Sequence, residues 1–487
     1  MTALDDRPWM STIPTDLYIG GNWRQAGRPD PIPVLDPATE QVLVTVADAS
    51  PEDGIAAVDA AAAALPGWAA ASPRHRSDVL MRAFALMTER REQLAELIVL
   101  ENGKALADAR GEVAYAAEFF RWYAEEAVRA AGTVQTAPAG TNNILVLRQP
   151  IGVAVLVTPW NFPAAMATRK IGPALAAGCT VVLKPATETP LTAFAIVALL
   201  EEAGVPPGVV NCVTTRSAGS VVKAMVDDPR VRKLSFTGST EVGRRLLATA
   251  AETVVSCSME LGGNAPFLVL ADADLDTAVA GAMLAKMRNG GSACTAANRF
   301  YVHASIEREF ASRLSVAMSR LRVGNGLDAG VDVGPLVNAP TRDKVAELVT
   351  GALDGGAAVL SGGSAPDRPG FFYTPTVLGE VPADASILRE EIFGPVAPVV
   401  PFDTVDEAIA LANDTEYGLV SYVYTGDLAQ GLAVSERLDS GMVGLNRGVV
   451  SDPAAPFGGT KQSGVGREGG HEGMLEYLES KYIAVGW

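Results

Sequence analysis

Short apolar runs alternate with amphipathic stretches through the middle of the chain. The strand-like runs are 153–157, 180–183, 209–213, 233–236 and 254–258, and the helix-like segments between them are 163–177, 191–203, 219–226 and 240–249. Strands that alternate with helices at this spacing predict a parallel sheet with helices on both faces. Ligands of such sheets bind at the carboxyl ends of the strands.

The same alternation returns in residues 265–445 and predicts a second α/β domain. Its strand-like runs are 265–270, 299–303, 357–360 and 396–402, and its helix-like segments are 274–287, 306–321, 341–354 and 405–413. Glycine-rich and proline-rich turns follow, and residues 481–485 read as a final strand. We therefore expect two α/β domains in series.

The chain before residue 150 has a different pattern. Residues 1–50 read as short strands and turns, and residues 53–129 read as helices. Ser50 and Pro51 have the character of a helix cap followed by a proline at the first helical position. Residues 141–148 form an extended run, which is either one arm of a hairpin or a connection between domains.

Composition and charge narrow the possible partners. The 487 residues are too many for one hydrophobic core and predict two or three domains. A net charge of -17 argues against nucleic acid and anionic membranes, which attract clustered Lys and Arg. Residues 1–16 lack the apolar run of a secretory signal, and runs such as 152–157 are too short to span a bilayer. We expect a cytoplasmic enzyme or binding protein.

One cysteine stands apart from the other candidate reactive residues. The cysteines are Cys179, Cys212, Cys257 and Cys294, and the histidines are His75, His303 and His471. Their spacing predicts neither a metal site nor a disulfide framework. Cys294 ends the sequence Asn-Gly-Gly-Ser-Ala-Cys, whose glycines allow close backbone approach. It is either a nucleophile, which at a thiol pKa of ~8.5 needs a base or an electropositive site, or a buried small apolar side chain.

Polar residues follow the predicted strands of the first sheet. The Asn161 amide suits an oxyanion, Lys184 is either a ribose or phosphate contact or a surface lysine, and Glu260 is either a general base or a helix cap or salt-bridge partner. The sequence of residues 236–243, Phe-Thr-Gly-Ser-Thr-Glu-Val-Gly, opens a helix and either suits a phosphate or is a tight turn. Together with Cys294, these residues predict a cysteine-based enzyme that uses a dinucleotide.

Seven motifs around these residues resemble the aldehyde dehydrogenase superfamily. They are TPWNFP, GCTVVLKPA, SFTGSTEVG, MELGGNAP, NGGSAC, EEIFGPV and PFGGTKQSGVGRE, and the resemblance runs from about residue 18 to the C-terminus. It implies an α/β fold with a Rossmann-type cofactor domain, an α/β catalytic domain, and a small β oligomerisation arm with a C-terminal segment. The implied boundaries are 1–134 with 151–262, then 263–445, then 135–150 with 446–487. A homodimer or homotetramer is also implied.

The resemblance implies a role for individual residues. Cys294 attacks the aldehyde carbon to give a thiohemiacetal, oxidation by NAD or NADP gives a thioester, and water activated by Glu260 releases the acid. Asn161 and the Cys294 backbone N–H form the oxyanion hole, while Lys170 and Glu468 relay the proton from Glu260. The implied cofactor-binding residues are Trp160, Lys184, Thr187, Gly238, Ser239, Gly243, Leu261, Glu391 and Phe393. Because relatives that transfer the acyl group to coenzyme A tend to lack this glutamate, Glu260 favours hydrolysis.

Within the superfamily, the chain resembles the succinate-semialdehyde dehydrogenase group most. The matching segments are PWNFPAAMATRKIGPALAAGC, KMRN and APFGGTKQSGVGREGG. In that group two arginines and a serine hold the substrate carboxylate, and they correspond here to Arg169, Arg288 and Ser451. Arginine suits a carboxylate, although each arginine is alternatively a surface salt-bridge partner. Arg447 adds a cation that lies near the substrate mouth or faces solvent, and Ala296 replaces a cysteine that forms a redox disulfide in some members.

Thr187 leaves the choice of cofactor open. NAD-preferring relatives usually have a glutamate there, which repels the 2′-phosphate of NADP, so threonine allows NADP, while the neighbouring Glu188 keeps NAD possible. The expected reaction is the oxidation of succinic semialdehyde to succinate with NADP or NAD. The alternatives are a dehydrogenase for glutaric semialdehyde or another aldehyde, a catalytically silent binding protein on this fold, and a cysteine hydrolase with a histidine beside Cys294.

Overall fold

The computed structural model describes residues 7–486. Residues 1–6 lie outside the described residues. They are the start of the predicted first domain and of the segment 1–16, in which no secretory signal is expected. Within the described part no single helix is long and apolar enough to cross a membrane, and one pair passes that test only when taken together across a bend of 115°.

The first sheet has eight strands in the order β2-β1-β9-β8-β7-β10-β11-β21. Their bounds are β1 (Leu17–Ile19), β2 (Asn22–Arg24), β7 (Val153–Val157), β8 (Thr180–Lys184), β9 (Val210–Cys212), β10 (Val231–Thr237), β11 (Ser256–Glu260) and β21 (Gly464–Val465). Strands β7 to β11 pair in parallel, as the alternation predicts. The antiparallel β21 comes from the C-terminal segment, so that segment completes the sheet of the first domain.

Helices cover both faces of this sheet, because each central strand is apolar on both sides. In β7, Ala154 and Leu156 join one apolar cluster, whereas Val153, Val155 and Val157 join another. Two groups of helices supply these clusters. The first group is α2 (Pro73–Glu89), α3 (Arg91–Asn102), α4 (Leu106–Glu126), α5 (Pro163–Ala177) and α6 (Pro190–Glu202), and the second is α1 (Pro51–Ala70), α7 (Ala218–Asp227) and α8 (Thr240–Ala251). Parallel strands buried on both faces are typical of such a layered sheet.

The predicted start of the first helix is confirmed. The Ser50 side chain accepts a hydrogen bond from the Asp53 N–H at 3.3 Å, and the Asp53 carboxylate accepts one from the Ser50 N–H at 3.0 Å. Pro51 occupies the first helical position, where its missing N–H costs nothing. The remaining short elements of this region are η1 (Pro8–Thr12), β3 (Ile32–Leu35), β4 (Val42–Val46) and η2 (Ala127–Arg129).

The second domain contains a seven-stranded sheet in the order β14-β15-β16-β13-β12-β18-β19. The strands are β12 (Ala265–Val269), β13 (Ala297–His303), β14 (Ala358–Ser361), β15 (Thr376–Gly379), β16 (Val396–Phe402), β18 (Val420–Tyr424) and β19 (Met442–Leu445). The helices are α9 (Leu275–Met287), η3 (Arg288–Gly291), α10 (Glu307–Ser319), α11 (Ala339–Asp354), η4 (Ser386–Leu388), α12 (Val405–Asn413) and α13 (Leu428–Arg437). Sequence patterns left β15, β18, β19 and α13 unassigned.

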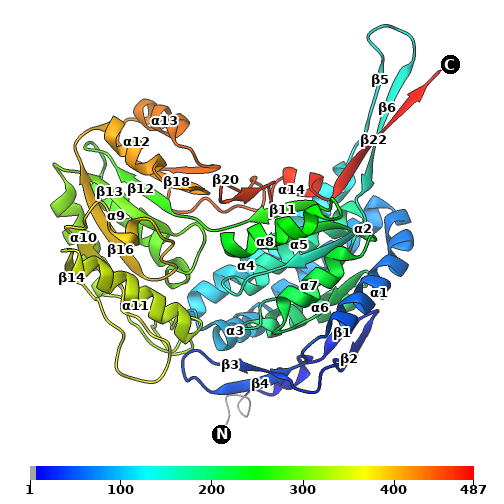
Figure 1. The fold of residues 1–487 in the computed structure, drawn as a ribbon, viewed down its shortest axis with the longest axis horizontal. Coiled ribbons are helices and arrows are strands. Elements are labelled where there is room, and N and C mark those ends of the chain that lie inside the picture. Colours follow the sequence, from blue (N-terminus) through cyan, green and yellow to red (C-terminus); the bar gives the residue numbers. More distant parts are fainter. Residues whose placement is uncertain (1–6, 487) are drawn as a thin grey trace.

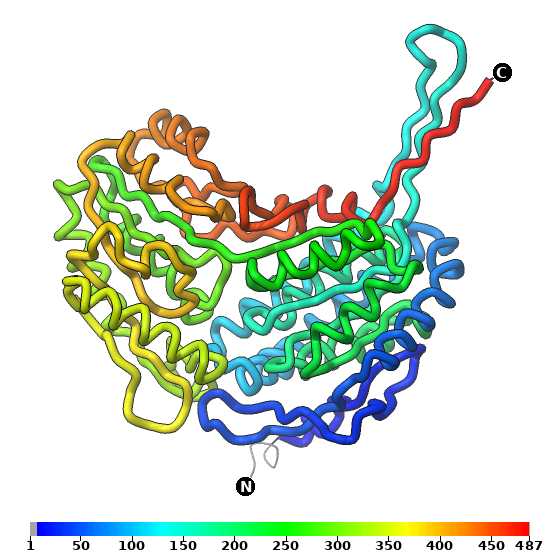
Figure 2. The backbone as a smooth tube through the Cα atoms, in the orientation of Figure 1, coloured from blue at the N-terminus to red at the C-terminus, as the bar shows by residue number. Residues whose placement is uncertain are grey.

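A three-stranded arm projects from the first domain (Figure 1). It consists of β5 (Thr133–Thr136), β6 (Asn143–Pro150) and β22 (Leu478–Val485), with β6 in the centre. The extended run 141–148 is therefore part of a hairpin, and Figure 2 shows the C-terminal strand running beside that hairpin. The remaining elements are β17 (Tyr417–Gly418), β20 (Thr460–Lys461) and α14 (Glu472–Leu475). The hairpin starts at Thr133, two residues before the predicted boundary.

Candidate active site

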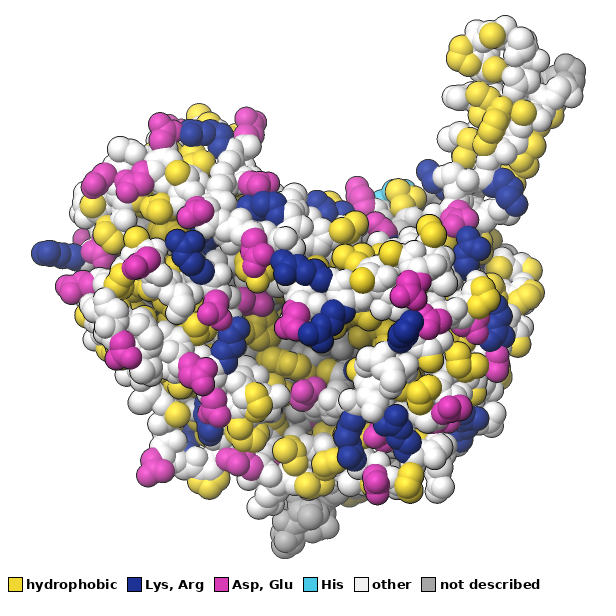
Figure 3. All heavy atoms as spheres, in the orientation of Figure 1, with side chains coloured by type: hydrophobic (Ala, Val, Ile, Leu, Met, Phe, Trp, Pro, Cys, Tyr) yellow, Lys and Arg dark blue, Asp and Glu magenta, His cyan; other side chains and the backbone are white. Residues whose placement is uncertain are grey.

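The polar residues at the predicted strand ends lie along one edge of the first sheet. Strands β8, β7, β10 and β11 are neighbours, so Val157 lies beside Lys184 and Thr237 lies beside Glu260. Asn161 is in the loop after β7. This edge faces the second domain, and Figure 3 shows a hollow between the two halves of the molecule. The carboxyl edge of a parallel sheet is where such folds bind ligands.

The loop that carries Cys294 needs its glycines. Asn289 has φ 55°, and Gly290 and Gly291 have φ 59° and 81°, so three successive residues are in the left-handed region. A Cβ on Gly291 would lie 2.2 Å from the carbonyl oxygen of Gly394. The sharp turn brings Cys294 from the end of α9 to the wall of the cleft.

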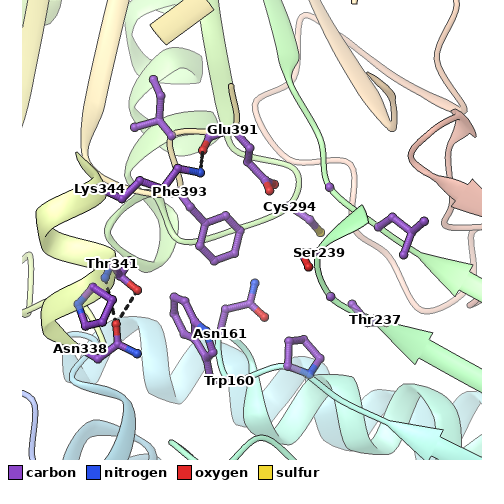
Figure 4. A pocket seen from close by; sticks show the side chains of 16 residues that line it. Trp160, Asn161, Thr237, Ser239, Cys294, Asn338, Thr341, Lys344, Glu391 and Phe393 are labelled. Carbon is purple, nitrogen blue, oxygen red and sulfur yellow. Dashed lines mark hydrogen bonds between the residues drawn. The ribbon is translucent and has the colours of Figure 1, made fainter. Parts of the chain in front are cut away.

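A cleft of about 350 Å³ joins the strand ends to Cys294. Figure 4 shows Asn161, Ser239 and Cys294 facing the same space, with Trp160 and Phe393 in edge-to-face contact at 5.3 Å between ring centroids. The cleft is lined by Pro159, Trp160, Asn161, Thr237, Gly238, Ser239, Leu261, Gly262, Cys294, Asn338, Pro340, Thr341, Lys344, Glu391, Ile392 and Phe393. Besides Cys294, seven of the predicted cofactor-binding and catalytic residues line this cleft. They are Trp160, Asn161, Gly238, Ser239, Leu261, Glu391 and Phe393.

Of the remaining predicted cofactor residues, only Thr187 lines a second cavity, together with Glu188, Arg216 and Asn338. Because Asn338 also lines the first cavity, the two are neighbours. Thr187 donates a hydrogen bond to the Glu188 carboxylate at 3.2 Å. Lys184 is only 7% exposed, so it is not a surface lysine. Burial lowers its pKa, and Glu188 opposes that effect.

The cleft fits a dinucleotide. Ser239 caps α8 by accepting from the Val242 N–H at 3.4 Å, and the positive end of this helix dipole faces the cleft. Gly243 lies behind the turn, where a Cβ would come within 2.4 Å of the Leu261 side chain. Helix α8 therefore packs tightly against Leu261, and its N-terminus at the cleft suits a pyrophosphate.

The surroundings of Cys294 favour the protonated thiol over the thiolate. Burial raises its pKa to about 12; Arg169 and Arg288 lower the pKa, while Glu260 and Glu391 raise it. The two arginines do not offset burial, so the cysteine depends on a base rather than on an electropositive site. Glu391 is itself shifted, because burial raises its pKa to about 7 although its carboxylate accepts from the Gly263 N–H at 3.1 Å.

Two buried glutamates lie in contrasting environments. Burial and the negative charge of Glu468 raise the pKa of Glu260 well above its ordinary value, and one Glu260 oxygen has no hydrogen-bond donor within the described residues. Glu468 is bound by Lys170 and by the Arg169 guanidinium, with an Arg169 Nε to Glu468 Oε2 distance of 2.5 Å. These two cations hold its pKa below the ordinary value. Glu260 is thus suited to accept a proton, whereas Glu468 stays ionised.

The predicted carboxylate-binding residues lie in two groups. The Arg288 guanidinium donates a hydrogen bond from Nη1 to Ser451 Oγ at 3.3 Å. It also lies 4.9 Å from the Phe162 ring centroid. Arg169 is instead buried against Glu468, with its guanidinium 4.3 Å above the Phe457 ring. Arg447 is exposed and donates to the Val449 carbonyl, so it faces solvent.

The histidines and the other cysteines take no part in this site. His471 contacts Glu126, His303 contacts Ser305, and His75 stacks against Trp68. Cys179 and Cys212 are buried and Cys257 is half-buried, in agreement with packing roles for the first two. Within residues 7–486 no cluster of three metal-ligating side chains occurs.

Sequence reasoning missed the contribution of α11. Asn338 caps this helix by accepting from the Thr341 N–H at 3.0 Å, and Lys344 donates to the Glu391 carbonyl at 2.9 Å. The Asn-Ala-Pro sequence before the helix is a cap signal. That signal places the start of the helix, but only the packing of the two domains turns this helix end towards the cleft.

Comparison with known proteins identifies close relatives along almost the whole chain. The aldehyde dehydrogenase family model matches residues 23–483. A succinate-semialdehyde dehydrogenase of Paenarthrobacter nicotinovorans is 55% identical over 91% of this chain and 99% of its own. A glutarate-semialdehyde dehydrogenase of Pseudomonas aeruginosa is 48% identical over 96% of this chain and 97% of its own.

Solved structures agree with the sequence comparison. The crystal structure of an NADP-dependent enzyme of E. coli superposes with a TM-score of 0.96 at 48% identity, covering 98% of this chain and 99% of the other. Both the cleft and the arm therefore belong to a fold that is already known.

Proposed function

Because the chain belongs to the aldehyde dehydrogenase family, we propose that it oxidises succinic semialdehyde to succinate with NADP or NAD. The observation that carries the substrate assignment is the half-buried Arg288 guanidinium, bound to Ser451 and close enough to Cys294 to lower the pKa of its thiol. A fixed positive charge near the nucleophile suits a substrate with a carboxylate at its far end. Arg169, from its pair with Glu468, adds a second positive charge.

The first chemical step belongs to Cys294 and Asn161. The thiol loses its proton to a base, and the sulfur attacks the aldehyde carbon to give a thiohemiacetal. The Asn161 amide donates to the Ser292 carbonyl at 3.2 Å, and a small rotation would bring it to the new oxyanion, together with the Cys294 backbone N–H. A nicotinamide cofactor, when bound, would supply the hydride acceptor needed to oxidise the thiohemiacetal to a thioester.

The second step belongs to Glu260. Its raised pKa makes the ionised form a better base than an ordinary carboxylate, and it takes a proton from the water that attacks the thioester. Lys170 and the ionised Glu468 are hydrogen-bonded to each other near Glu260 and can relay that proton away from it. The products are the carboxylic acid and the free thiol.

Glutaric semialdehyde is the second candidate substrate. It carries the same two functional groups with one more methylene, and a relative named for it is 48% identical to this chain. One methylene changes discrimination by only ~10- to 200-fold. Substrate length must therefore be measured rather than read from the arginines.

The arm supports a homo-oligomer, a dimer or tetramer. Val134, Tyr482 and Ile483 expose 69%, 58% and 37% of their surface, and the outer strands β5 and β22 have no neighbour beyond them in the three-stranded sheet. Open edges with apolar side chains are pairing surfaces. A second copy of the chain is the partner we infer.

The test of the substrate assignment is reduced-cofactor absorbance with succinic semialdehyde, glutaric semialdehyde and butanal, each with NAD and NADP. In Arg288→Ala we expect kcat/KM for the acid semialdehydes to fall ~100-fold or more, because a charge-assisted pair is lost. Butanal should change less than ~3-fold, since it has no carboxylate. The matched control is Arg447→Ala, which removes an exposed guanidinium. Equal losses for butanal and the acids would make Arg288 structural and refute the carboxylate site.

A further inference from the structure

The corner between helices α3 and α4 places four polar side chains against the candidate active site. We call Asn102, Lys104, Asp108 and Glu112 the corner residues. Asn102, Lys104 and Glu112 are 3%, 4% and 2% exposed, and Asp108 is half-buried. None of them lines the cofactor cleft. Their burial needs an explanation, because polar and charged groups are costly to bury unless they are paired.

Three of the corner residues bind the backbone of the cofactor domain. Lys104 Nζ donates to the Asn161 carbonyl at 2.8 Å, and Asn102 Nδ2 donates to the Trp160 carbonyl at 2.9 Å. The Glu112 carboxylate accepts from the Ala164 N–H at 2.8 Å, at the start of α5. The backbone on both sides of the Asn161 side chain is therefore held from α3 and α4.

The fourth corner residue binds the catalytic loop of the other domain. Asp108 Oδ2 accepts from the Asn289 N–H at 3.0 Å. The Asn289 side chain in turn donates to the Asn161 carbonyl at 2.7 Å and to the Ser292 carbonyl at 2.9 Å. The Asn161 carbonyl thus accepts one hydrogen bond from Lys104 and one from the loop that carries Cys294.

The two charges at the corner depend on each other. Lys104 and Glu112 form a buried ion pair, and the Lys104 ammonium also lies 4.3 Å from the Phe162 ring centroid. A buried ion pair is weak evidence for stability, because desolvation offsets the attraction. What the pair provides instead is a fixed position for the ammonium group, which is hydrogen-bonded directly to the Asn161 carbonyl and shielded from solvent.

We propose that Lys104, held by Glu112, is a positioning residue that fixes the Asn161 amide relative to Cys294. This inference rests on the oxyanion role proposed above for Asn161. Oxyanion donors must be placed closely, and an error of about 1 Å costs on the order of 100-fold in rate. Lys104 itself contacts the site through the Asn161 carbonyl, whereas the Trp160 carbonyl is held by Asn102, so removal of Lys104 should affect the chemical steps and leave cofactor binding unchanged.

The test removes both charges together, because Lys104→Met alone would leave Glu112 buried and unpaired. In the Lys104→Met/Glu112→Gln variant, the glutamine oxygen still accepts from Ala164, and we expect kcat to fall ~10- to 100-fold. Cofactor affinity, measured by quenching of tryptophan fluorescence, should stay within ~2-fold, since the corner does not line the cleft. The surface pair variant Lys223→Met/Asp227→Asn is the matched control and should keep full activity.

The deciding comparison repeats the double substitution in the Asn161→Ala background. If the corner acts through Asn161, the further loss of kcat there is less than ~2-fold, because coupled residues are not additive. An equal loss in both backgrounds, or no loss in either, overturns the inference. A full kcat in Asn161→Ala alone instead refutes the oxyanion role on which it rests. If the double variant does not fold, Lys104→Arg, which keeps a cation beside Glu112 but moves the donor to the Asn161 carbonyl, gives the same comparison with a smaller expected loss.

Discussion

The environment of each carboxylate, rather than its residue type, decides its role at the residue scale. Glu468 is bound by Lys170 and Arg169 and keeps its charge, whereas Glu260 has no such partner and is buried, so it holds a proton more tightly. Glutamates of different pKa at one site are a common way of separating acid from base. The family resemblance implied Glu260 as the base and Glu468 as part of a proton relay, and their surroundings give the physical reason for that division.

The pH dependence of turnover should follow Glu260. Because its pKa is raised, Glu260 loses its proton only at pH values above the ordinary glutamate range. The ionised form is the base, so the rate of hydrolysis should rise with pH as Glu260 ionises. In Glu260→Gln we expect one turnover of reduced cofactor per site in a burst, and then a steady rate lower by ~10²- to 10⁴-fold with little pH dependence. Stopped-flow absorbance from pH 5 to 9 measures both phases. An unchanged pH profile would exclude Glu260 as the base, and Glu241→Gln, an exposed glutamate, is the control.

We expect Thr187 to decide whether the 2′-phosphate of NADP is tolerated at the other end of the site. Its hydroxyl donates to Glu188 and so leaves no negative charge of its own near Lys184. In Thr187→Glu we expect kcat/KM for NADP to fall ~100-fold, because like charges in contact cost several kcal/mol, while the value for NAD changes less than ~3-fold. Thr187→Val removes the hydroxyl without adding charge and should keep the wild-type ratio. Parallel losses with both cofactors would contradict this reading.

At the scale of the element, two helices beside the site have local caps, and a third is capped by a side chain from elsewhere in the chain. Ser239 caps α8 and Asn338 caps α11 from the adjacent residue, as a sequence reader expects. Helix α6 differs: Glu101, on α3, accepts from the Leu191 and Thr192 N–H groups at 2.8 and 2.9 Å. The residue before α6, Thr189, makes no such bond. A cap from 90 residues away links α3 to α6, which no local pattern shows.

Loss of this distant cap should destabilise the first domain. Glu101 is 0% exposed, so Glu101→Ala leaves two backbone N–H groups and the Thr192 hydroxyl without their acceptor. We expect the free energy of unfolding to fall by ~2–4 kcal/mol. Urea unfolding followed by tryptophan fluorescence measures it. Glu89→Ala, at the exposed end of α2, should stay within ~0.5 kcal/mol of wild type, and a similar small change in Glu101→Ala would show that the cap is dispensable.

The whole molecule consists of two domains, each built on one large sheet, with the cleft between them and an arm that projects from the first domain. Chain order does not follow this arrangement, because β21 and β22, near the C-terminus, join the first sheet and the arm. The C-terminal segment therefore ties the cofactor domain to the arm. It also supplies Glu468 to the site, between those two strands.

The arm should hold copies of the chain together. Ile483, on the outer strand β22, is 37% exposed in the isolated chain, and Ile483→Asp would place a charge on this surface. We expect a smaller species by light scattering with size-exclusion chromatography, because a buried unpaired charge costs several kcal/mol in an interface. The control is Glu479→Ala, because Glu479 is a polar residue that is exposed on the same strand. An unchanged mass in Ile483→Asp would show that the arm does not form the interface.

The sequence by itself determined the elements and the chemistry. The alternation of apolar runs predicted the strands and helices of both domains, and the bounds 163–177 of α5 were predicted to the residue, because periodicity and caps are local properties. The motifs also marked Cys294, Glu260 and Asn161, since their residue types and glycines follow from what the backbone and the reaction require. The strands β15 and β19 were missed because four residues are too few for a period, and α13 was missed because Gly431 interrupts its helical pattern.

Only the tertiary structure decided which residues share a space and what charge they carry. Arg169 and Arg288 look equivalent in the sequence, yet one is paired with Glu468 and the other with Ser451. The raised pKa of Cys294 comes from burial between two domains. Lys104 contacts Asn161 across 57 residues. Burial and long-range pairing depend on every element at once, so no local pattern of the chain contains them.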